Sequence, residues 1–119
     1  GQRIGYVTDL RFTEANLDVL GPMLEGVDRL FIESVFLDAD RAHALRKNHL
    51  TARQAGQIAC AVGARSVVPL HFSPRYGSRA AELAAEVHAA WSAPPRPQAE
   101  ADPDRAVPDL SRLWARAMR

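Results

Sequence analysis

Three short apolar runs alternate with segments of helical periodicity, and this alternation constrains the possible folds more than any other feature of the sequence. The runs cover residues 4–8, 29–33 and 66–70, and each has the length and composition of a β-strand. Strands that are separated by helices pair in parallel through right-handed crossovers. The sequence therefore predicts an α/β fold with the order β-α-β-α-α-β-α and an additional helix at the tail.

Local signals bound the first two helices. Thr13 is placed as the N-cap of the helix that follows the first strand. Gly21 and Pro22 should end or kink this helix, because proline removes a backbone donor and clashes with the preceding turn. Asp38 is placed to cap a short second helix over residues 39–47.

The third and fourth helices each carry an apolar stripe that predicts a buried face. Thr51 and Gln54 match a capping box at the start of the third helix, and Gly63 stops it. The fourth helix is expected over residues 79–91. The stripes comprise Ala55, Ile58, Ala59 and Val62 in the third helix and Ala80, Leu83, Ala84, Val87 and Trp91 in the fourth.

The chain is expected to form one domain followed by a linker and a tail. Residues 1–91 contain all the predicted strands. Residues 92–108 are rich in proline and acidic side chains, which predicts a flexible linker. Residues 109–119 predict an amphipathic helix that either docks on the core or meets a partner. Because three strands make a small sheet, we expect an exposed edge or face that a missing segment or a second chain covers.

Composition excludes several classes of protein. A formal net charge of +1 gives no global attraction to nucleic acid or membrane, so any such binding requires a local patch. The single cysteine, Cys60, excludes an internal disulfide framework, is expected to be a small buried hydrophobe, and fits a reducing compartment such as the cytoplasm. No apolar run approaches the ~20 residues of a membrane span.

Ionisable residues stand at the ends of all three predicted strands. They are Asp9, Glu33 and His71, and His49 precedes the third helix. Because the carboxyl ends of parallel strands meet at one edge of a sheet, these side chains are expected to converge. A carboxylate and an imidazole are suitable ligands for zinc or manganese, which favours Asp9 and His71 as metal ligands. Glu33 can orient His49 and stabilise its protonated form, so that His49 serves as a general acid.

Each of these residues also has a purely structural interpretation. Asp9 can form a strand-to-loop turn, Glu33 can face solvent at a strand end, and His49 can be a helix-entry residue. His71 carries the strongest functional signal, because Ser-Pro-Arg follows it beyond the strand end. The other two histidines lie in the middle of predicted helices and are expected at the surface: His43 and His88.

Four short blocks of this sequence stand in the same order as in a known family of enzymes. The blocks are GYVTD at residues 5–9, FIESVF at 31–36, HLTARQAG at 49–56 and HFSPRY at 71–76. They resemble the carboxyl-terminal half of ribonuclease Z, a family of the metallo-β-lactamase superfamily. One block alone is a weak signal, whereas four in the family's order are a strong one. The resemblance implies one half of an αββα sandwich.

The resemblance to ribonuclease Z also implies a two-zinc phosphodiesterase that trims the 3′ ends of transfer-RNA precursors. It implies that Asp9 bridges the two zinc ions and that His71 completes one of the two sites. It further implies that Glu33 and His49 assist the leaving group, and that a water between the metals is the nucleophile. The residues that it implies near the phosphate of the RNA, or of another phosphodiester substrate, are Ser73 and Arg75.

Two departures from the family's pattern bear on activity. Residues 32–35 read Ile-Glu-Ser-Val where the family carries His-Glu-Ala-Thr, so only Glu33 is retained. The family's His-x-His-x-Asp-His metal motif and a further histidine before Asp9 are absent. That motif belongs to the amino-terminal half of the domain, which is the partner that this chain is expected to need. Since catalytic zinc usually has three protein ligands, the chain alone is expected to bind zinc weakly or not at all and to be inactive.

The sequence leaves alternatives to a transfer-RNA processing enzyme. A hydrolase of the same fold can act on a different substrate. A non-catalytic fragment can associate through an exposed sheet, and a homodimer is the expected assembly. A nucleotide-binding α/β domain is disfavoured, because Asp-Leu-Arg-Phe at residues 9–12 stands where a glycine-rich phosphate loop would follow the first strand.

Overall fold

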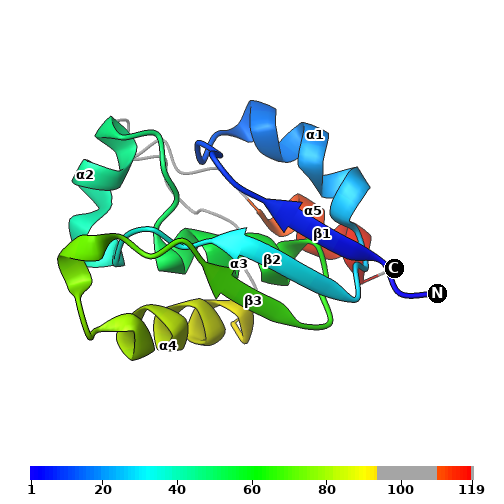
Figure 1. The fold of residues 1–119 in the computed structure, drawn as a ribbon. Coiled ribbons are helices and arrows are strands. Elements are labelled where there is room, and N and C mark those ends of the chain that lie inside the picture. The colour runs from blue at the N-terminus through cyan, green and yellow to red at the C-terminus, as the bar shows by residue number, and fades with distance from the viewer. Residues whose placement is uncertain (94–109, 119) are drawn as a thin grey trace.

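A computed structural model describes residues 1–93 and 110–118 of the chain, and its sheet is shown in Figure 1. The sheet has three parallel strands in the order β1 (Ile4–Val7), β2 (Arg29–Glu33) and β3 (Val67–Leu70). The predicted α/β class and parallel pairing are confirmed. The observed strands are slightly shorter than predicted, because the first excludes residue 8 and the third excludes residue 66.

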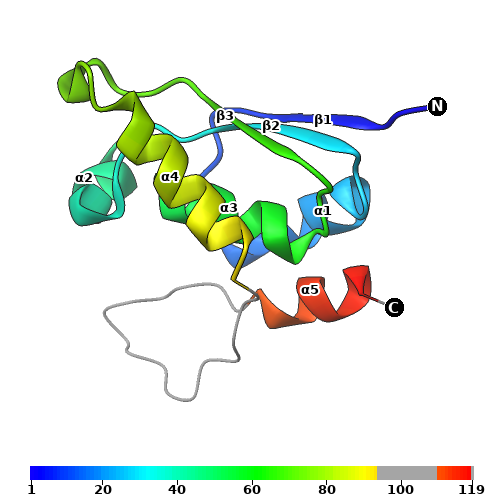
Figure 2. The same cartoon turned by 90° about the horizontal axis from the view of Figure 1, so that it is seen from below.

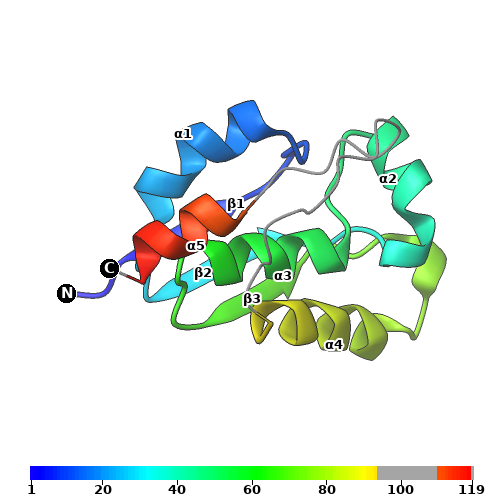
Figure 3. The same ribbon diagram turned by 180° about the vertical axis from the view of Figure 1, so that it is seen from behind.

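The described part of the chain also contains five helices and two 3-10 turns. They are α1 (Glu14–Leu24), η1 (Asp38–Asp40), α2 (Arg41–Arg46), α3 (Ala52–Ala61), η2 (Pro74–Tyr76), α4 (Ala80–Trp91) and α5 (Ser111–Ala117), of which η2, α4 and α5 follow the last strand. Figure 2 shows α1, α3, α4 and α5 on one face of the sheet. From behind, in Figure 3, α3 and α5 lie in front of the strands, with α1 and α4 on either side. Within these described elements, no helix is both long enough and apolar enough to cross a membrane.

Helix α3 forms the centre of the core. The predicted capping box is present, since the Thr51 hydroxyl accepts from the Gln54 N–H and the Gln54 side chain accepts from the Thr51 N–H. The predicted stripe on α3 is buried, and Gly63 follows the helix with a φ of +69°. A Cβ atom added to Gly56 would lie only 2.2 Å from the carbonyl oxygen of Val87 in α4. The missing side chain of Gly56 therefore allows α3 and α4 to pack closely.

Helix α4 presents only part of its predicted stripe to the core. Leu83 and Val87 are fully buried, whereas Ala84 and Trp91 are half-buried and Ala80 is exposed at the first turn. The indole N–H of Trp91 donates to the backbone carbonyl of Ala64, in the loop between α3 and β3, at 3.0 Å. The predicted buried stripe is therefore confirmed at Leu83 and Val87, and it wrongly includes Ala80.

Helix α1 departs from the prediction at its end. Thr13 caps it as predicted, with its hydroxyl accepting from the Asn16 N–H at 3.2 Å. The helix then continues through Gly21 and Pro22 to Leu24, so of the two expected outcomes, an end or a kink, the end of the helix at this pair is wrong. Pro22 is exposed in the last turn, where water can bond to the carbonyl that proline leaves without a donor. Leu24 is buried beyond it, and this burial holds the last turn in place.

The predicted cap of α2 is also wrong. Asp38 begins η1, and the N-cap residue of α2 is Asp40, whose side chain makes no capping hydrogen bond. The Asp38 carboxylate lies between two guanidinium groups instead, 3.8 Å from Arg41 and 3.7 Å from Arg53. The helix expected over residues 39–47 is therefore an irregular turn followed by a shorter helix.

The tail helix docks on the core, which was one of the two outcomes expected for it. Helix α5 packs against α3, and Leu110 just before it is buried. Leu113 lies over Gly21 of α1, where an added Cβ atom would come within 2.5 Å of the leucine side chain. From residue 94 onward, the segment predicted as a linker lies outside the described residues.

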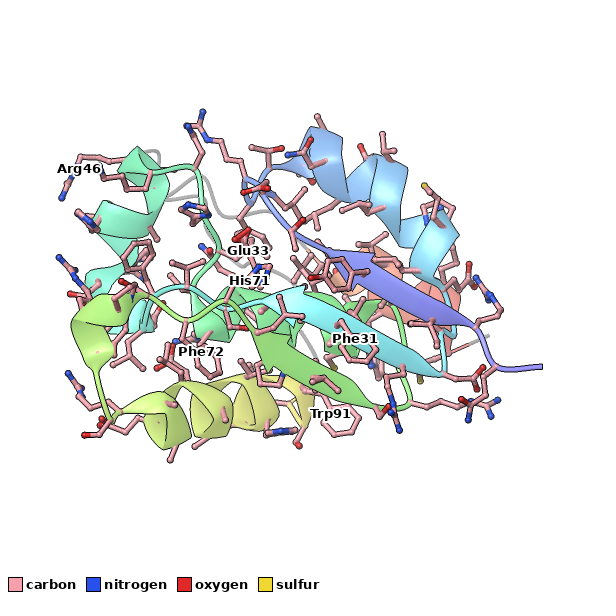
Figure 4. The ribbon with its side chains drawn as sticks, in the orientation of Figure 1. Phe31, Glu33, Arg46, His71, Phe72 and Trp91 are labelled. Carbon is pink, nitrogen blue, oxygen red and sulfur yellow. The ribbon has the colours of Figure 1, made fainter. Side chains whose placement is uncertain are left out.

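The face of the sheet opposite the helices carries an uncovered apolar row. Tyr6, Phe31 and Val68 lie side by side in the register of the three strands. Tyr6 is 61% exposed and its ring centroid lies 6.3 Å from that of Phe31, while Phe31 and Val68 are half-buried. Figure 4 shows Phe31 on this bare face. The expectation of an exposed sheet face is therefore confirmed.

The close contact at Gly56 predicts that alanine at this position lowers the stability of the protein, although helix propensity alone would raise it. Gly56→Ala should lower the free energy of unfolding by about 1–3 kcal/mol, because the new methyl group overlaps the α4 backbone. Urea unfolding followed by circular dichroism measures this change. Ala85→Gly, at an exposed position in the middle of α4, is the control and should show only the ordinary propensity cost of about 1 kcal/mol. A Gly56→Ala variant more stable than the parent would contradict the packing argument.

Candidate functional site

The carboxyl ends of all three strands open into one pocket of about 380 Å³. Asp9 follows β1, Glu33 ends β2, His71 follows β3, and His49 joins them from the loop before α3. Figure 4 labels Glu33 and His71 at this edge of the sheet. The structure therefore places around one pocket the four ionisable residues that the sequence placed at strand ends and at the helix entry, and His71 lies outside the closer cluster of Asp9, Glu33 and His49. The other lining residues are Val35, Phe36, His43, Lys47, Phe72, Ser73 and Pro74.

Glu33 is buried, and both of its carboxylate oxygens have partners. Only 2% of its surface is exposed. One oxygen accepts a hydrogen bond from the backbone N–H of Asp9, and the other accepts from Nδ1 of His49 at 2.9 Å. Because a carboxylate can only accept, His49 carries a proton on Nδ1. Glu33 therefore does not face solvent, and it positions the Asp9 backbone and the His49 ring together.

Three non-glycine residues of the described chain have a left-handed backbone, and all three lie at or beside the pocket. The φ angle is +53° at Asp9, +57° at Asn48 and +57° at His71. Asn48 immediately precedes His49. This conformation costs on the order of 1 kcal/mol for a residue with a side chain. Backbone strain concentrated at one pocket is typical of a functional site.

Asp9 and His71 offer donor atoms that the other described residues leave free. The Asp9 carboxylate and the His71 imidazole nitrogens make no hydrogen bond or ion pair with any described residue, and the His71 ring meets Tyr6 edge-on. One ligand atom each from Asp9, Glu33 and His49 lie within 4.8 Å of one another, a spacing that can hold a metal ion. Glu33 and His49 are already hydrogen-bonded to each other. The ligand atoms of Asp9 and His71 are therefore more available to a metal ion. A carboxylate and an imidazole fit zinc or manganese.

Of the two residues expected near a substrate phosphate, Ser73 lines the pocket and Arg75 does not. The Ser73 hydroxyl accepts from the Arg75 N–H at 3.4 Å and caps η2. The Arg75 guanidinium lies over the Phe36 ring, 5.7 Å from its centroid, and 3.8 Å from the Asp40 carboxylate. Arg75 is therefore held next to the pocket rather than in its lining.

His43 is a pocket residue that sequence reasoning missed, whereas Lys47, which also lines the pocket, stands close to His49 in the sequence, where it could be expected to meet a phosphate. His43 was expected at the surface, but it lines the pocket and its ring packs edge-on against Phe36, with 5.1 Å between centroids. Partial burial lowers the pKa of His43, and the positive charges of Arg75, Arg46 and Lys47 lower it further. His43 is therefore neutral at neutral pH. The available signal was position, since the end of α2 leads directly into the loop of the expected general acid.

Buried Tyr76 holds in place the segment that carries Phe36, a residue of the pocket lining. The Tyr76 hydroxyl accepts from the Leu37 N–H at 2.9 Å and donates to the Asp40 carboxylate. Burial raises the pKa of this hydroxyl, and donation to Asp40 raises it further, so the group remains a donor at neutral pH. The Tyr76 ring also lies 6.5 Å from the Phe36 ring. These contacts tie η1 to η2 and hold Phe36 between them.

Comparison with known proteins places this geometry in context. A family described as beta-lactamase superfamily domain matches residues 1–72. Ribonuclease Z of Streptomyces avermitilis is 46% identical over 76 residues, which cover 64% of this chain and 24% of the relative. Ribonuclease Z of Deinococcus radiodurans is 40% identical over 76 residues, covering 64% and 23%. Ribonuclease Z of Kineococcus radiotolerans is 39% identical over 90 residues, covering 76% and 27%. The chain thus spans about a quarter of the length of these relatives.

The left-handed backbone at the pocket predicts an unusual order of stability among variants. Asp9→Gly and His71→Gly should each be more stable than the corresponding alanine variant by about 1 kcal/mol, because only glycine adopts positive φ without strain. Thermal unfolding of the four variants measures these differences. At the helical position Glu82, which is exposed, the order of the glycine and alanine variants should reverse. Equal stability of the paired variants at Asp9 and His71 would show that the backbone there carries no strain.

Proposed function

We propose, since this chain belongs to the beta-lactamase superfamily, that it forms part of a zinc-dependent phosphodiesterase that resembles ribonuclease Z and acts on transfer-RNA precursors. The observation that supports this most is the composition of the pocket. Two free donors, Asp9 and His71, stand there beside the bonded pair Glu33 and His49. Donors for a metal next to a carboxylate–imidazole pair suit hydrolysis of a phosphodiester, which needs an activated water and a protonated leaving oxygen.

In this proposal Asp9 and His71 would be the residues of this chain that hold zinc. Bound zinc supplies a water of lowered pKa as the nucleophile. The backbone of this chain orients the Asp9 and His71 side chains. Both residues turn away from their strands through a left-handed backbone, and the bond from the Asp9 N–H to Glu33 fixes the first of these turns.

Glu33 and His49 are proposed to assist the leaving group. Glu33 holds the proton of His49 on Nδ1, which leaves Nε2 to exchange a proton with the substrate. When both ring nitrogens carry protons, Nε2 donates its proton to the leaving oxygen, and the Glu33 carboxylate stabilises the positive ring through the hydrogen bond between them. His49 is then the general acid, and Glu33 is the residue that positions it.

Ser73 and Arg75 are proposed to meet the substrate phosphate. Ser73 already lines the pocket. Arg75 reaches it by leaving Asp40, with which it forms a partly exposed ion pair at 3.8 Å. Such a pair contributes only about 0–1 kcal/mol, so a phosphate can compete for the guanidinium.

The proposal requires a companion half of the domain. The two free donors are fewer than the three protein ligands that a catalytic zinc usually has. The companion would supply the His-x-His-x-Asp-His motif, cover the apolar row of Tyr6, Phe31 and Val68, and complete an αββα sandwich. Residues 1–91 would then be the carboxyl-terminal half, residues 92–108 a linker, and residues 109–119 the tail, in a cytoplasmic enzyme.

A second candidate function is hydrolysis of a phosphodiester other than transfer RNA by the same fold. Ser34 and Val35 support it, because they replace the family's Ala-Thr and Val35 lines the pocket. The exposed apolar row also supports a non-catalytic alternative, a homodimer formed through the bare sheet face.

Titration calorimetry of the 119-residue chain with zinc tests the metal site. We expect weak binding that Asp9→Ala and His71→Ala each weaken further, because two free donors supply too few ligands. His88→Ala, which removes an exposed imidazole from α4, is the matched control and should leave the titration unchanged. Tight stoichiometric binding by the chain alone would contradict the need for a companion half.

Hydrolysis by the full-length protein tests the activity, with a transfer-RNA precursor and a simple diaryl phosphodiester as substrates. We expect cleavage of the precursor, and a kcat lowered by about 10²–10⁴-fold in His49→Ala because the general acid is lost. His88→Ala should retain full activity. Cleavage of the simple diester alone would favour the second candidate function, and cleavage of neither substrate would refute the proposal.

A further inference from the structure

The pocket has two walls of different chemistry. Asp9 and Glu33 place carboxylates at the strand ends, whereas His43 and Lys47 place nitrogen groups on the side formed by α2 and its C-cap. Lys47 is exposed and forms no ion pair with any residue that the structure describes. An ammonium group with no acidic partner at the mouth of a pocket is available to bind an anion from solution.

Positive charge concentrates on the α2 side of the pocket. His43 packs against the Phe36 ring, and the Arg75 guanidinium lies over the same ring. After the effect of its partial burial, the pKa of His43 is lowered by Arg75, Arg46 and Lys47, and only Asp40 opposes them. Three cationic side chains therefore act on the His43 ring, and the Asp40 carboxylate offsets them only in part.

We propose that Lys47 and His43 form a subsite for the phosphate that neighbours the cleaved one, so that the pocket binds a single-stranded polynucleotide through two successive phosphates. This inference rests on the proposed phosphodiesterase function and adds to it a second phosphate contact made by the chain itself. The carboxylate wall can hold a phosphate only through a cation, whereas the Lys47 ammonium binds one directly and the neutral His43 ring adds a hydrogen-bonding nitrogen. Contacts of this kind position a strand without reading its bases.

Arg29 offers a matched comparison for Lys47. It carries the same charge and is exposed, but it begins β2, at the opposite end of the strand from Glu33, and it does not line the pocket. Arg46 is unsuitable as a control, because its guanidinium lies 3.4 Å from Nδ1 of His43 in the proposed subsite. Lys47→Gln and Arg29→Gln therefore remove the same charge from the chain, and only Lys47→Gln removes it from the pocket.

Fluorescence anisotropy of a labelled single-stranded oligoribonucleotide with the 119-residue chain, at several salt concentrations, tests the subsite. We expect Lys47→Gln to weaken binding about two- to fivefold, the range for an exposed charge pair. The slope of log affinity against log salt should fall by about 0.7, the value for one phosphate contact on a single strand. Arg29→Gln should change the affinity and the slope much less. Equal losses in both variants, no loss in Lys47→Gln, or no binding by the parent chain would overturn the subsite.

Kinetics of the full-length protein separate this inference from the proposed function. Lys47→Gln should raise KM for an oligoribonucleotide and leave kcat/KM for a diester with a single phosphate unchanged. Equal loss on both substrates would overturn the subsite and leave the phosphodiesterase function in place. Binding of RNA that depends on Lys47, in a protein that cleaves neither substrate, would support the subsite and refute the function.

Discussion

A buried carboxylate at the end of the central strand holds the site together. Burial of a charged group is costly unless hydrogen bonds satisfy it, and Glu33 is only 2% exposed. Its partners, the Asp9 N–H and the His49 ring, come from the loop after β1 and the loop before α3. The requirement to satisfy Glu33 therefore fixes both loops against the sheet. For this reason the residue belongs to the fold as much as to the chemistry.

Helix α4 secures the segment that follows Glu33. One oxygen of Glu86 accepts from the backbone N–H of Asp38 at 2.7 Å and from that of Arg53 at 3.2 Å, so a single α4 side chain joins η1 to the start of α3. Glu86 adjoins Val87, whose carbonyl oxygen meets the surface of Gly56. Close packing of α3 and α4 is therefore what brings the Glu86 carboxylate to the two N–H groups. The pocket wall depends in this way on a glycine in the core.

Much of the fold and the convergence of the site could be predicted from sequence, because both follow from local rules. Apolar runs and caps mark the elements, and parallel pairing then brings the residues at the strand ends to one edge. The predictions were wrong where contacts between residues distant in sequence determine the local structure. Helix α1 continues through Pro22 because Leu24 is buried beyond it, and His43 reaches the pocket because α2 packs against Phe36. The left-handed backbone at Asp9 could likewise not be predicted from the sequence, because aspartate occurs in many types of turn.

The bare sheet face and the pocket are physically continuous. Tyr6, in the apolar row, presents its ring edge-on to His71, with 6.5 Å between ring centroids. A surface that covers Tyr6 and Phe31 must therefore also approach the His71 imidazole. Burial of apolar area contributes about 25 cal/mol per Å², and the same contact would limit the rotation of the imidazole and exclude water beside it. Association over the sheet and completion of the metal site are thus coupled, because one aromatic ring belongs to both surfaces.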